Sequence, residues 1–337
     1  MVVCPFCSAS GAVELESASV QDLDRLYQRL YKAPVARLFG EHRSLSLMSC
    51  TACDLRWYEP MIGGDEDFYN TLQHKSWYYV EHKHEFDLAL PYIEPSDRVL
   101  EVGSGKGNFA RFVQQVRGKE GIRYTGLDFS QEAQRMAAAN GIDIRVQSVQ
   151  EFSRANPESQ DIVCAFQVLE HVVDIRSFVD AMTTAVRPGG LLLIAVPSED
   201  SYIASSNNLA LNLPPHHISR YPDRWFHRAA QILNLELVAL EHDPLQPHHR
   251  YDYIYQLTIE ACYRCLAWTG LRRKPVDHSW MNWLFRIPAT LLGHFLSRGL
   301  NARNSPYGHT VFAVFRKPLQ ATHEPTVSDS LAQRPTD

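Results

Sequence analysis

One run of residues combines glycines with a carboxylate in a pattern that suits cofactor binding. Residues 101–107 read Glu-Val-Gly-Ser-Gly-Lys-Gly and directly follow the short apolar stretch Arg98-Val-Leu. Glycine lets a backbone turn sharply and approach a ligand closely. A loop of this kind between a strand and a helix often binds a nucleotide cofactor. The predicted cofactor-binding residues of this loop are Glu101, Gly103, Ser104, Gly105 and Gly107.

A second carboxylate ends the next apolar segment. Tyr124-Thr-Gly-Leu-Asp128 reads as a strand, and Ser130 is expected to cap the helix that follows. A carboxylate at the end of this strand can accept hydrogen bonds from both hydroxyls of a ribose. Asp128 and its neighbour Phe129 are therefore predicted to bind the cofactor.

The spacing of the glycines distinguishes two cofactors. A dinucleotide-binding G-x-G-x-x-G pattern would place its third glycine at position 108, but that residue is Asn108. Glu101 would be awkward beside a pyrophosphate, whereas it suits an ammonium or a sulfonium. S-adenosylmethionine carries both cations and is the predicted cofactor, with a nicotinamide dinucleotide as the alternative.

Four segments together resemble the class I S-adenosylmethionine-dependent methyltransferases. They are Val99 to Phe109, Leu127-Asp128, Asp161 to Val172 (DIVCAFQVLEHV) and Arg187 to Pro197 (RPGGLLLIAVP). The resemblance covers residues 75 to 240 and the strand expected at 309 to 316. It implies an α/β fold with a Rossmann-like seven-stranded sheet. The alternation of strands with helices predicts that this sheet is parallel and doubly wound, with a ligand at the carboxyl ends of its strands. The seven expected strands are Arg98 to Val102, Tyr124 to Asp128, Ile142 to Val146, Ile162 to Phe166, Leu191 to Val196, Leu235 to Leu240 and Thr310 to Arg316.

The chain departs from the common pattern of that family after the third expected strand. Many members place an acidic residue there to meet the adenine amino group, but this chain reads Gln147-Ser-Val-Gln-Glu151. Gln150, or the backbone at Ser148 and Val149, is expected to take over this contact. Gln167, after the fourth expected strand, is assigned to the cofactor site as well.

Histidines supply the candidates for the acceptor side. His171 follows the fourth expected strand, and His216 and His217 follow the fifth within Leu213-Pro-Pro-His-His. Each can act as a base for an acceptor that must lose a proton, because imidazole titrates near neutrality. Packing and a rigid loop wall are the alternatives. Amino-group methyltransferases of one class carry Asn or Asp before Pro-Pro-Tyr at the segment that here reads Gln167-Val-Leu-Glu170, which favours an oxygen or carbon acceptor.

Two CxxC pairs near the start of the chain indicate a structural zinc site. Four thiolates can close a tetrahedral site with no open position. The predicted ligands are Cys4, Cys7, Cys50 and Cys53. The interval from residue 8 to residue 49 is longer than in a compact zinc ribbon, and a helix such as Leu23 to Leu38 is expected to fill it. Cys262 and Cys265 lie in an apolar helical stretch and are expected to pack in a core.

The expected organisation is a chain of six parts. They are a zinc-binding module (1–60), a helical lid or linker (61–95), the methyltransferase core (96–250), a helical insertion (251–305), the last core strand (306–318) and a disordered tail (319–337). Trp77, Tyr78 and Tyr79 lie in the expected lid, where any of them could face a sulfonium. Trp280, Leu284, Ile287, Leu291 and Phe295 recur at helical intervals in the insertion, and Pro288 is expected to kink that helix. This apolar face suits a helical cap, a dimer face or contact with a membrane surface.

Composition narrows the partners. The net charge of −5 over 337 residues offers no basic field for a polyanion, so no nucleic acid is expected. The chain begins without the charged and apolar regions of a signal peptide, and it has no uninterrupted apolar run of about 18 residues. A cytoplasmic location is therefore expected, with peripheral contact at the inner face of a membrane and a homodimer as further expectations. The order of zinc ribbon and methyltransferase core resembles bacterial methyltransferases of sugars and secondary metabolites, which implies a sugar or envelope glycoconjugate as acceptor. A quinone or polyketide acceptor and a non-catalytic cofactor-binding scaffold are the alternatives.

Overall fold

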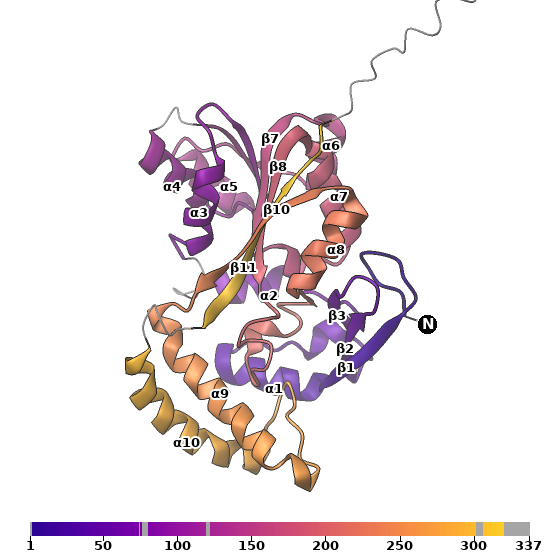
Figure 1. The fold of residues 1–337 in the computed structure, drawn as a ribbon, viewed down its shortest axis with the longest axis vertical. Coiled ribbons are helices and arrows are strands. Elements are labelled where there is room, and N and C mark those ends of the chain that lie inside the picture. The colour runs from indigo at the N-terminus through magenta and orange to yellow at the C-terminus, as the bar shows by residue number, and fades with distance from the viewer. Residues whose placement is uncertain (1, 74, 76–79, 119–121, 301–305, 320–337) are drawn as a thin grey trace, which may run out of the picture.

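The computed structural model describes residues 2–73, 75, 80–118, 122–300 and 306–319, and two sheets form its framework (Figure 1). The larger sheet has seven strands in the order β10-β11-β8-β7-β4-β5-β6. Their bounds are β4 Arg98–Val102, β5 Arg123–Asp128, β6 Ile144–Val146, β7 Gln160–Phe166, β8 Val186–Pro197, β10 Glu236–Pro244 and β11 Tyr307–Arg316. The predicted fold class, an α/β protein with a seven-stranded sheet of the Rossmann-like type, is confirmed.

The strand direction differs from the prediction at one edge of this sheet. The strands β6, β5, β4, β7 and β8 run parallel to one another, whereas β11 runs antiparallel to both β8 and β10. The alternation of strands and helices predicted a wholly parallel sheet. The difference arises because the chain leaves β10 at the carboxyl edge, forms two helices there, and re-enters the sheet as β11 from that same edge.

Helices cover both faces of the large sheet, and the strand residues alternate between the two cores. On β7, Val163 and Ala165 pack with α6, α7 and α8, whereas Ile162, Cys164 and Phe166 pack on the side of α3 and α4. This two-residue period is that of a strand buried on both faces. The helices are α3 His84–Ala89, α4 Asn108–Arg117, α5 Gln131–Ala138, α6 Val149–Ala155, α7 Ile175–Ala185 and α8 Asp223–Leu233. Ser130 caps α5 as predicted, because its hydroxyl accepts from the Ala133 amide at 3.1 Å.

The smaller sheet contains the N-terminal strands and one short strand from the methyltransferase-like region. Its order is β1-β2-β3-β9, all antiparallel. The elements are β1 Ala12–Ser19, α1 Val20–Tyr31, β2 Ser44–Cys50, β3 Arg56–Glu59, α2 Glu66–Gln73 and β9 Ser219–Arg220. The amide of Tyr58 on β3 donates to the carbonyl of Ile218 at 2.9 Å, just before β9. The N-terminal module therefore completes its sheet with residues from far along the chain.

The helix between the cysteine pairs begins and ends earlier than predicted. The helix α1 ends at Tyr31, and Lys32 takes the left-handed conformation at its end. The Asp24 carboxylate then accepts from the amides of Val35 and Ala36, at 2.7 and 2.9 Å, which reverses the chain into a short 3-10 helix, Ala36–Phe39. The helix predicted from Leu23 to Leu38 is thus wrong at both ends. It begins at Val20, and it ends at Tyr31 because Lys32 and Pro34 break its C-terminal half.

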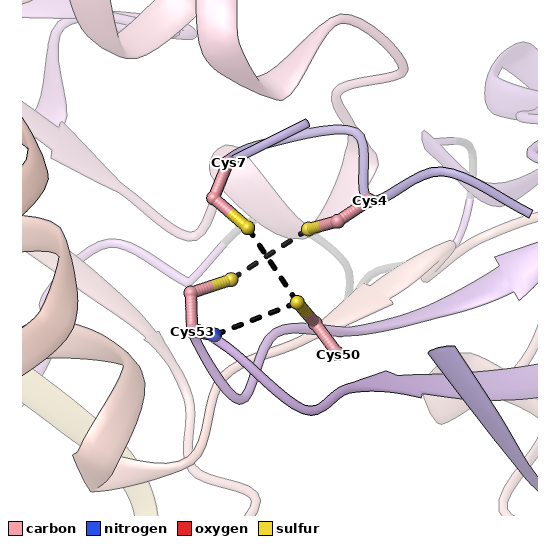
Figure 2. A group of neighbouring side chains, drawn as sticks. All are labelled: Cys4, Cys7, Cys50 and Cys53. Carbon is pink, nitrogen blue, oxygen red and sulfur yellow. Dashed lines mark hydrogen bonds between the residues drawn. The ribbon is translucent and has the colours of Figure 1, made fainter. Parts of the chain in front are cut away.

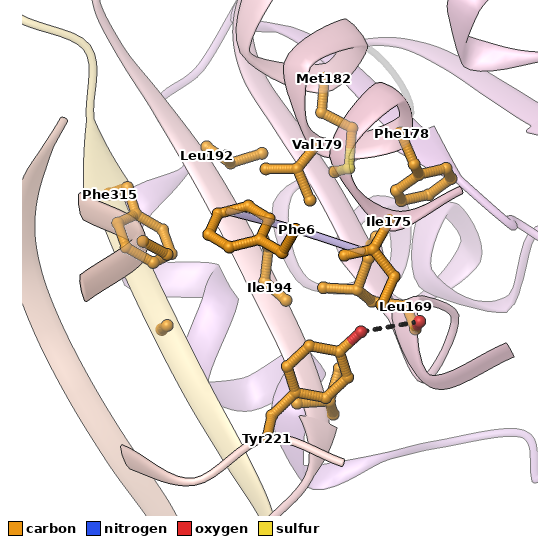
Figure 3. Packing of buried hydrophobic residues seen from close by; sticks show 14 of the residues in the cluster. Phe6, Leu169, Ile175, Phe178, Val179, Met182, Leu192, Ile194, Tyr221 and Phe315 are labelled. Carbon is orange, nitrogen blue, oxygen red and sulfur yellow. Dashed lines mark hydrogen bonds between the residues drawn. The ribbon is translucent and has the colours of Figure 1, made fainter. Parts of the chain in front are cut away.

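The aromatic residue inside the first CxxC pair packs in the core of the large sheet. Phe6 is fully buried and belongs to the same cluster as Val179 and Ile194 (Figure 3). Its ring centroid lies 5.2 Å from that of Trp225 on α8. The hydrophobic core is therefore continuous from the N-terminal module into the large sheet.

The insertion before the last strand is a pair of helices, α9 Arg250–Cys265 and α10 Trp280–Leu296. The helix α10 buries Phe285 and Ala289 against α9 and continues through Pro288. Trp280, Trp283 and Phe295 are 71%, 64% and 70% exposed, so the opposite face is apolar and uncovered. Among the described residues, no helix has both the length and the apolarity that crossing a membrane requires.

Short 3-10 helices complete the described chain. Besides Ala36–Phe39 they are η2 Leu90–Tyr92, η3 Leu169–His171, η4 Ala210–Asn212, η5 Pro247–His249, η6 Ala267–Thr269 and η7 Ser297–Gly299. Two of them, η3 and η4, lie in the segments that carry the candidate histidines.

One buried arginine joins the two sheets. Arg220 on β9 is 6% exposed, and its guanidinium donates to the Tyr58 hydroxyl at 2.7 Å and to the Asn212 carbonyl at 3.1 Å. Carboxylate oxygens of Glu199 and Glu16 lie 3.5 and 3.6 Å from the same group. These contacts come from the N-terminal module, the end of β8 and the loop that leads to His216.

We predict that Arg220→Met lowers the free energy of unfolding by about 2 to 4 kcal/mol, because the change leaves the Tyr58 hydroxyl and the Asn212 carbonyl without their donor, while Arg56 and Arg273 still pair with Glu199 and Glu16. Chemical denaturation monitored by circular dichroism measures this loss. Arg264→Met is the matched control, since Arg264 is largely exposed and pairs with Glu260 at 2.6 Å within α9 and such pairs contribute at most about 1 kcal/mol. Equal effects of the two substitutions would contradict a linking role for Arg220.

Candidate active site

The glycine loop connects β4 to α4 and has the backbone that only glycine adopts readily. Gly103, Gly105 and Gly107 have φ values of 74°, 51° and 74°. A Cβ atom on Gly103 would lie 2.4 Å from a methyl carbon of Val168. Both the left-handed backbone and the close approach therefore require glycine at Gly103, and the loop lies directly against the segment that leads to His171.

The Asp128 carboxylate lies at the end of β5 and faces this loop. Its Oδ2 accepts from the Gly105 amide at 2.8 Å, and its Oδ1 accepts from the Ser130 amide at 2.8 Å. Each carboxylate oxygen can accept a second hydrogen bond, so the group can still bind two ribose hydroxyls. Phe129, the next residue, is 80% exposed. A large apolar ring so exposed beside the loop suits the face of a planar base.

Glu101 lies beneath the loop and is 4% exposed. The Tyr124 hydroxyl donates to its Oε2. Burial raises the pKa of Glu101 to about 8, against the opposing effects of the Tyr124 hydrogen bond and the charge of Lys83, while Asp128 raises it further. A cation bound at this position would stabilise the ionised carboxylate.

The two predicted glutamines lie in different surroundings. The Gln150 side chain donates to the Ser177 hydroxyl at 3.3 Å, which directs it towards the start of α7. Gln167 has a backbone φ of 59°. Its side-chain Nε2 lies 3.3 Å from Glu85 Oε1 and 3.4 Å from Thr310 Oγ1. Gln167 is thus part of a polar group at the carboxyl edge of the sheet, and the contact of Gln150 with adenine stays a prediction.

The three predicted histidines lie side by side although they come from two distant segments. The ring centroids of His171 and His216 are 4.6 Å apart, those of His171 and His217 are 4.9 Å apart, and His216 stacks on His217 at 4.6 Å. Burial lowers the pKa of His171 to about 4 and holds the pKa values of His216 and His217 well below their usual range. The structure therefore brings together the residues that the sequence could only propose as alternatives.

Glu170 is a site residue that the sequence prediction did not include. Its side chain is 1% exposed, and burial raises its pKa to about 8. Its Oε1 lies 3.9 Å from Nε2 of both His171 and His217. The signal in the sequence was an acidic residue directly before His171, but nothing in the local pattern indicated that it would be buried.

Other buried polar residues gather at the same edge of the sheet and were also missed. The Asp243 carboxylate, at the end of β10, accepts from the Thr310 amide at 2.9 Å. His309 precedes Thr310, and its ring centroid lies 4.6 Å from that of His249. Glu85 and Asp243 are 5% and 3% exposed. With Gln167, these residues give the carboxyl edge a polar lining beside β7, β10 and β11.

The four N-terminal cysteines converge as two facing turns (Figure 2). Their sulfur atoms all lie within 4.8 Å of one another. The distance between Sγ of Cys4 and Sγ of Cys53 is 3.6 Å, and that between Sγ of Cys7 and Sγ of Cys50 is 3.5 Å. Sulfur atoms at about 2.3 Å from a tetrahedral zinc ion are about 3.8 Å apart. The residue after each pair, Ser8 or Asp54, has a left-handed φ, so both turns have the same form. The cluster therefore has the donors and the spacing of a closed four-sulfur site.

Two predictions fall on other parts of the chain. Trp77, Tyr78 and Tyr79, the predicted lid aromatics, lie outside the described residues, as does most of the predicted tail. Cys262 packs beside the core of α9 and α10, whereas Cys265 is exposed. The prediction of core packing thus holds for Cys262, while Cys265 faces solvent.

Comparison with known proteins agrees with this geometry. A family model described as a methyltransferase domain matches residues 73–240. These residues belong to that methyltransferase family. The match confirms the prediction of an S-adenosylmethionine-dependent methyltransferase domain. The motifs that predicted it lie within the matched residues.

Individual relatives share a part of this domain. The ubiquinone biosynthesis O-methyltransferase of Xanthomonas campestris is 31% identical over 114 residues, which are 32% of this chain and 46% of that protein. That of Sodalis glossinidius is 36% identical over 98 residues, or 27% and 38% of the two chains. The chain thus spans less than half the length of these curated relatives.

Solved structures resemble the fold at low identity. A methyltransferase from Archaeoglobus fulgidus has a TM-score of 0.47 at 15% identity, over 74% of this chain and 99% of that one. The YcgJ protein of Bacillus subtilis has a TM-score of 0.44 at 16% identity, over 71% and 100%. Likeness at this level does not extend to substrates.

We predict that S-adenosylhomocysteine binds more tightly as the pH rises from 6.5 towards 8. Below a pKa of about 8 Glu101 is mostly protonated, and the ammonium group of this ligand must expel that proton to pair with the carboxylate, which weakens binding by up to about tenfold per pH unit. Calorimetric titration in phosphate and in Tris, whose ionisation enthalpies differ, measures both the affinity and the released proton. In the matched variant Glu101→Gln both effects should vanish, and a proton release that persists there would contradict this assignment.

Proposed function

We propose that the protein transfers the methyl group of S-adenosylmethionine to an oxygen or carbon atom of a hydrophilic small molecule, with a sugar or an envelope glycoconjugate as the acceptor class. The observation that carries this proposal is the polar lining at the carboxyl edge of the sheet. Buried carboxylates, an amide and imidazoles there suit the hydroxyls of such an acceptor, because a buried polar group needs a hydrogen-bonding partner. A quinone ring offers these groups fewer hydrogen-bond donors and acceptors than a sugar does.

On the cofactor side, the proposal assigns the ribose to Asp128, the adenine to Phe129 and Gln150, and the ammonium and sulfonium to the surroundings of Glu101. The amides and the open space of the glycine loop, from Gly103 through Ser104 and Gly105 to Gly107, would let the cofactor approach the backbone. Gln167, which belongs to the polar lining, would contact the methionine part. The close approach of Gly103 to Val168 supports placing these groups next to His171.

On the acceptor side, the proposal places the reacting atom beside His171, His216 and His217. Methyl transfer is an in-line displacement, so the largest contribution comes from holding the acceptor atom opposite the sulfur. The histidines lie on two segments that follow β7 and β8, which is where an acceptor would meet the methyl group of a cofactor bound in the loop.

The quinone alternative has one specific argument in its favour. Curated relatives such as that of Xanthomonas campestris are named ubiquinone biosynthesis O-methyltransferases. Their similarity covers 32% of this chain, whereas the N-terminal module and the helical insertion lie outside the matched domain at residues 73–240. Acceptor specificity usually resides in such added segments, so the similarity supports the shared cofactor chemistry more than a shared acceptor.

We also propose that Cys4, Cys7, Cys50 and Cys53 bind a structural zinc ion. Four sulfur donors leave no open coordination position, so this ion would hold the fold and would take no part in methyl transfer. The burial of Phe6 between Cys4 and Cys7 supports this role, because the knuckle that the ion closes would position a side chain of the main core.

The exposed apolar face of α10 suits a peripheral contact with a membrane surface that carries a lipid-linked acceptor. Arg286 lies on the same helix, and Arg272, Arg273 and Lys274 precede it, so the apolar face has basic neighbours. A second copy of the chain is the alternative occupant. Flotation with anionic liposomes and sedimentation of the protein alone distinguish these two occupants.

The proposed function predicts that the protein binds S-adenosylhomocysteine with micromolar affinity and does not bind NADH. Asp128→Ala should weaken that binding by about tenfold to a hundredfold, because each hydrogen bond to a charged group contributes about 1.5 to 3 kcal/mol. Calorimetric titration measures both ligands on one sample. Asp180→Ala is the matched control, since Asp180 lies on the exposed side of α7. Binding of NADH with no binding of S-adenosylhomocysteine would refute the proposal, and binding without turnover of any acceptor would favour the scaffold alternative.

Metal removal should unfold the N-terminal module and open the core around Phe6. A chelator, or Cys50→Ser, is expected to lower the melting temperature by about 6 °C or more, which corresponds to about 2 to 3 kcal/mol in a chain of this size. The fluorescence of the buried Trp57 and Trp225 should shift to the red. Cys265→Ser, at an exposed cysteine outside the cluster, should leave metal content and melting temperature unchanged. A chelated protein that melts like the untreated one would disprove the structural role of the ion.

A further inference from the structure

The carboxylate of Glu170 lies buried without a hydrogen bond. Both of its oxygens are inaccessible to solvent and lack a hydrogen-bond partner among the described residues. An ionised carboxylate in such a place is unstable unless it is paired or bound to a metal ion. The group therefore indicates that a cation belongs beside it.

The imidazole rings of His171 and His217 lie beside this carboxylate, and the ring of His216 packs against both. Nδ1 of His171 lies 2.5 Å from the His216 carbonyl oxygen, and Nδ1 of His216 lies 3.0 Å from the Leu211 carbonyl oxygen. Nδ1 of His217 lies 3.3 Å from Asn212 Oδ1. A carbonyl oxygen can only accept, so these neighbours place the proton on Nδ1 and the lone pair on Nε2. Histidines that bind metals are held in this way by oxygens outside the coordination sphere.

The remaining distances suit an ion between the groups. Nε2 of His171 and Nε2 of His217 are each 3.9 Å from Glu170 Oε1, which is too long for a hydrogen bond. The three histidines can offer ligand atoms that all lie within 4.8 Å of one another. Donors bound at about 2.0 to 2.2 Å in a tetrahedron are about 3.4 Å apart, so small side-chain rotations would bring these atoms to a common centre.

The frame of this cluster is rigid. The Ile218 amide donates to the Glu170 carbonyl at 2.9 Å, and the Tyr221 hydroxyl donates to the Leu169 carbonyl at 3.0 Å. These bonds tie η3, which carries Glu170 and His171, to the segment that carries His216 and His217. The donor set is therefore preorganised by the fold.

We propose that His171, His216 and His217 bind one divalent first-row transition-metal ion, with the Glu170 carboxylate beside it and a fourth coordination position left open, at a site distinct from the cysteine cluster. Imidazole and carboxylate together suit ions of the zinc and iron(II) type. Lys83 is the cation whose charge acts on Glu170 from the segment before α3, and no ion pair joins the two among the described residues. The cation at Glu170 is thus a bound ion and not this ammonium.

The role of the ion rests on the proposed function, whereas its binding does not. An acceptor hydroxyl that coordinates the ion becomes more acidic, and its proton passes to water. The resulting oxyanion forms a bond to the methyl carbon while the bond from that carbon to sulfur breaks, and the electron pair stays on sulfur as S-adenosylhomocysteine. In this arrangement the histidines are ligands, and the acceptor class narrows to molecules with an oxygen that can bind a metal.

Titration of the purified full-length protein with Co²⁺ tests the site, with zinc left in the cysteine cluster. Cobalt bound by imidazole and carboxylate has visible d–d absorption without the intense near-ultraviolet charge-transfer band of cobalt bound to thiolates. We expect saturable visible absorption for one ion per chain. His217→Gln and the nearly isosteric Glu170→Gln should weaken this binding at least tenfold. The control His227→Gln changes an exposed histidine of α8 and should leave it unaltered.

Absence of a saturable visible band in the wild-type protein would overturn the proposal, and so would a band with thiolate charge transfer. Unchanged cobalt affinity in both Glu170→Gln and His217→Gln would overturn it as well. The wild-type titration needs no variant, so the test holds even if one substitution prevents folding. Thermal denaturation of each variant shows whether it is folded. Calorimetry with S-adenosylhomocysteine on the same samples separates the two proposals. Cofactor binding without cobalt binding refutes the metal site alone, and cobalt binding without cofactor binding refutes the proposed function alone.

Discussion

The guanidinium of Arg220 contacts three parts of the structure that meet beside the candidate histidines. It binds the N-terminal module through Tyr58 and Glu16, the end of β8 through Glu199, and the histidine loop through Asn212. A buried arginine is stable only where its donors and its charge are satisfied. The position of Arg220 thereby fixes β9 against β3 and, four residues earlier, the place of His216 and its neighbours.

Buried acidic groups give the carboxyl edge of the sheet its chemical character. Glu101, Glu170 and Asp243 all have raised pKa values because burial disfavours their charge. The charge of Lys83 lowers the pKa values of the first two. Carboxyl groups at such an edge can ionise when a cation binds beside them, so the edge favours cationic ligands over anionic ones. This preference agrees with a sulfonium cofactor and disfavours a pyrophosphate.

Much of the large sheet and of the cofactor loop could be predicted from local sequence. Apolar runs such as Leu191 to Val196 mark buried strands, and the alternating glycines mark a loop whose backbone few other residues can adopt. The four cysteines could be predicted to converge because two CxxC pairs together can bind one zinc ion. The strands, the glycine loop and each CxxC pair are decided within a few neighbouring residues.

What could not be predicted depends on contacts between distant residues. The strand β9 is two residues long and exists because β3 lies beside it, while β1 has a mostly exposed surface without an apolar period. The antiparallel direction of β11 follows from where the helices α9 and α10 leave the chain. Glu170 lies between Leu169 and His171 in the sequence, and local sequence does not show that His217 from the next loop lies 3.9 Å from its carboxylate.

The late position of β9 in the chain has a consequence for biosynthesis. A ribosome releases the N-terminus first, and many domains fold as they emerge. Here the first cysteine pair must wait for residues 50 and 53, and the edge of β3 stays unpaired until Ser219 and Arg220 have been made. During most of translation the nascent chain therefore exposes a strand edge and the Phe6 side chain, both of which favour aggregation. An early supply of metal, or a chaperone that covers this edge, would matter most for the yield of folded protein.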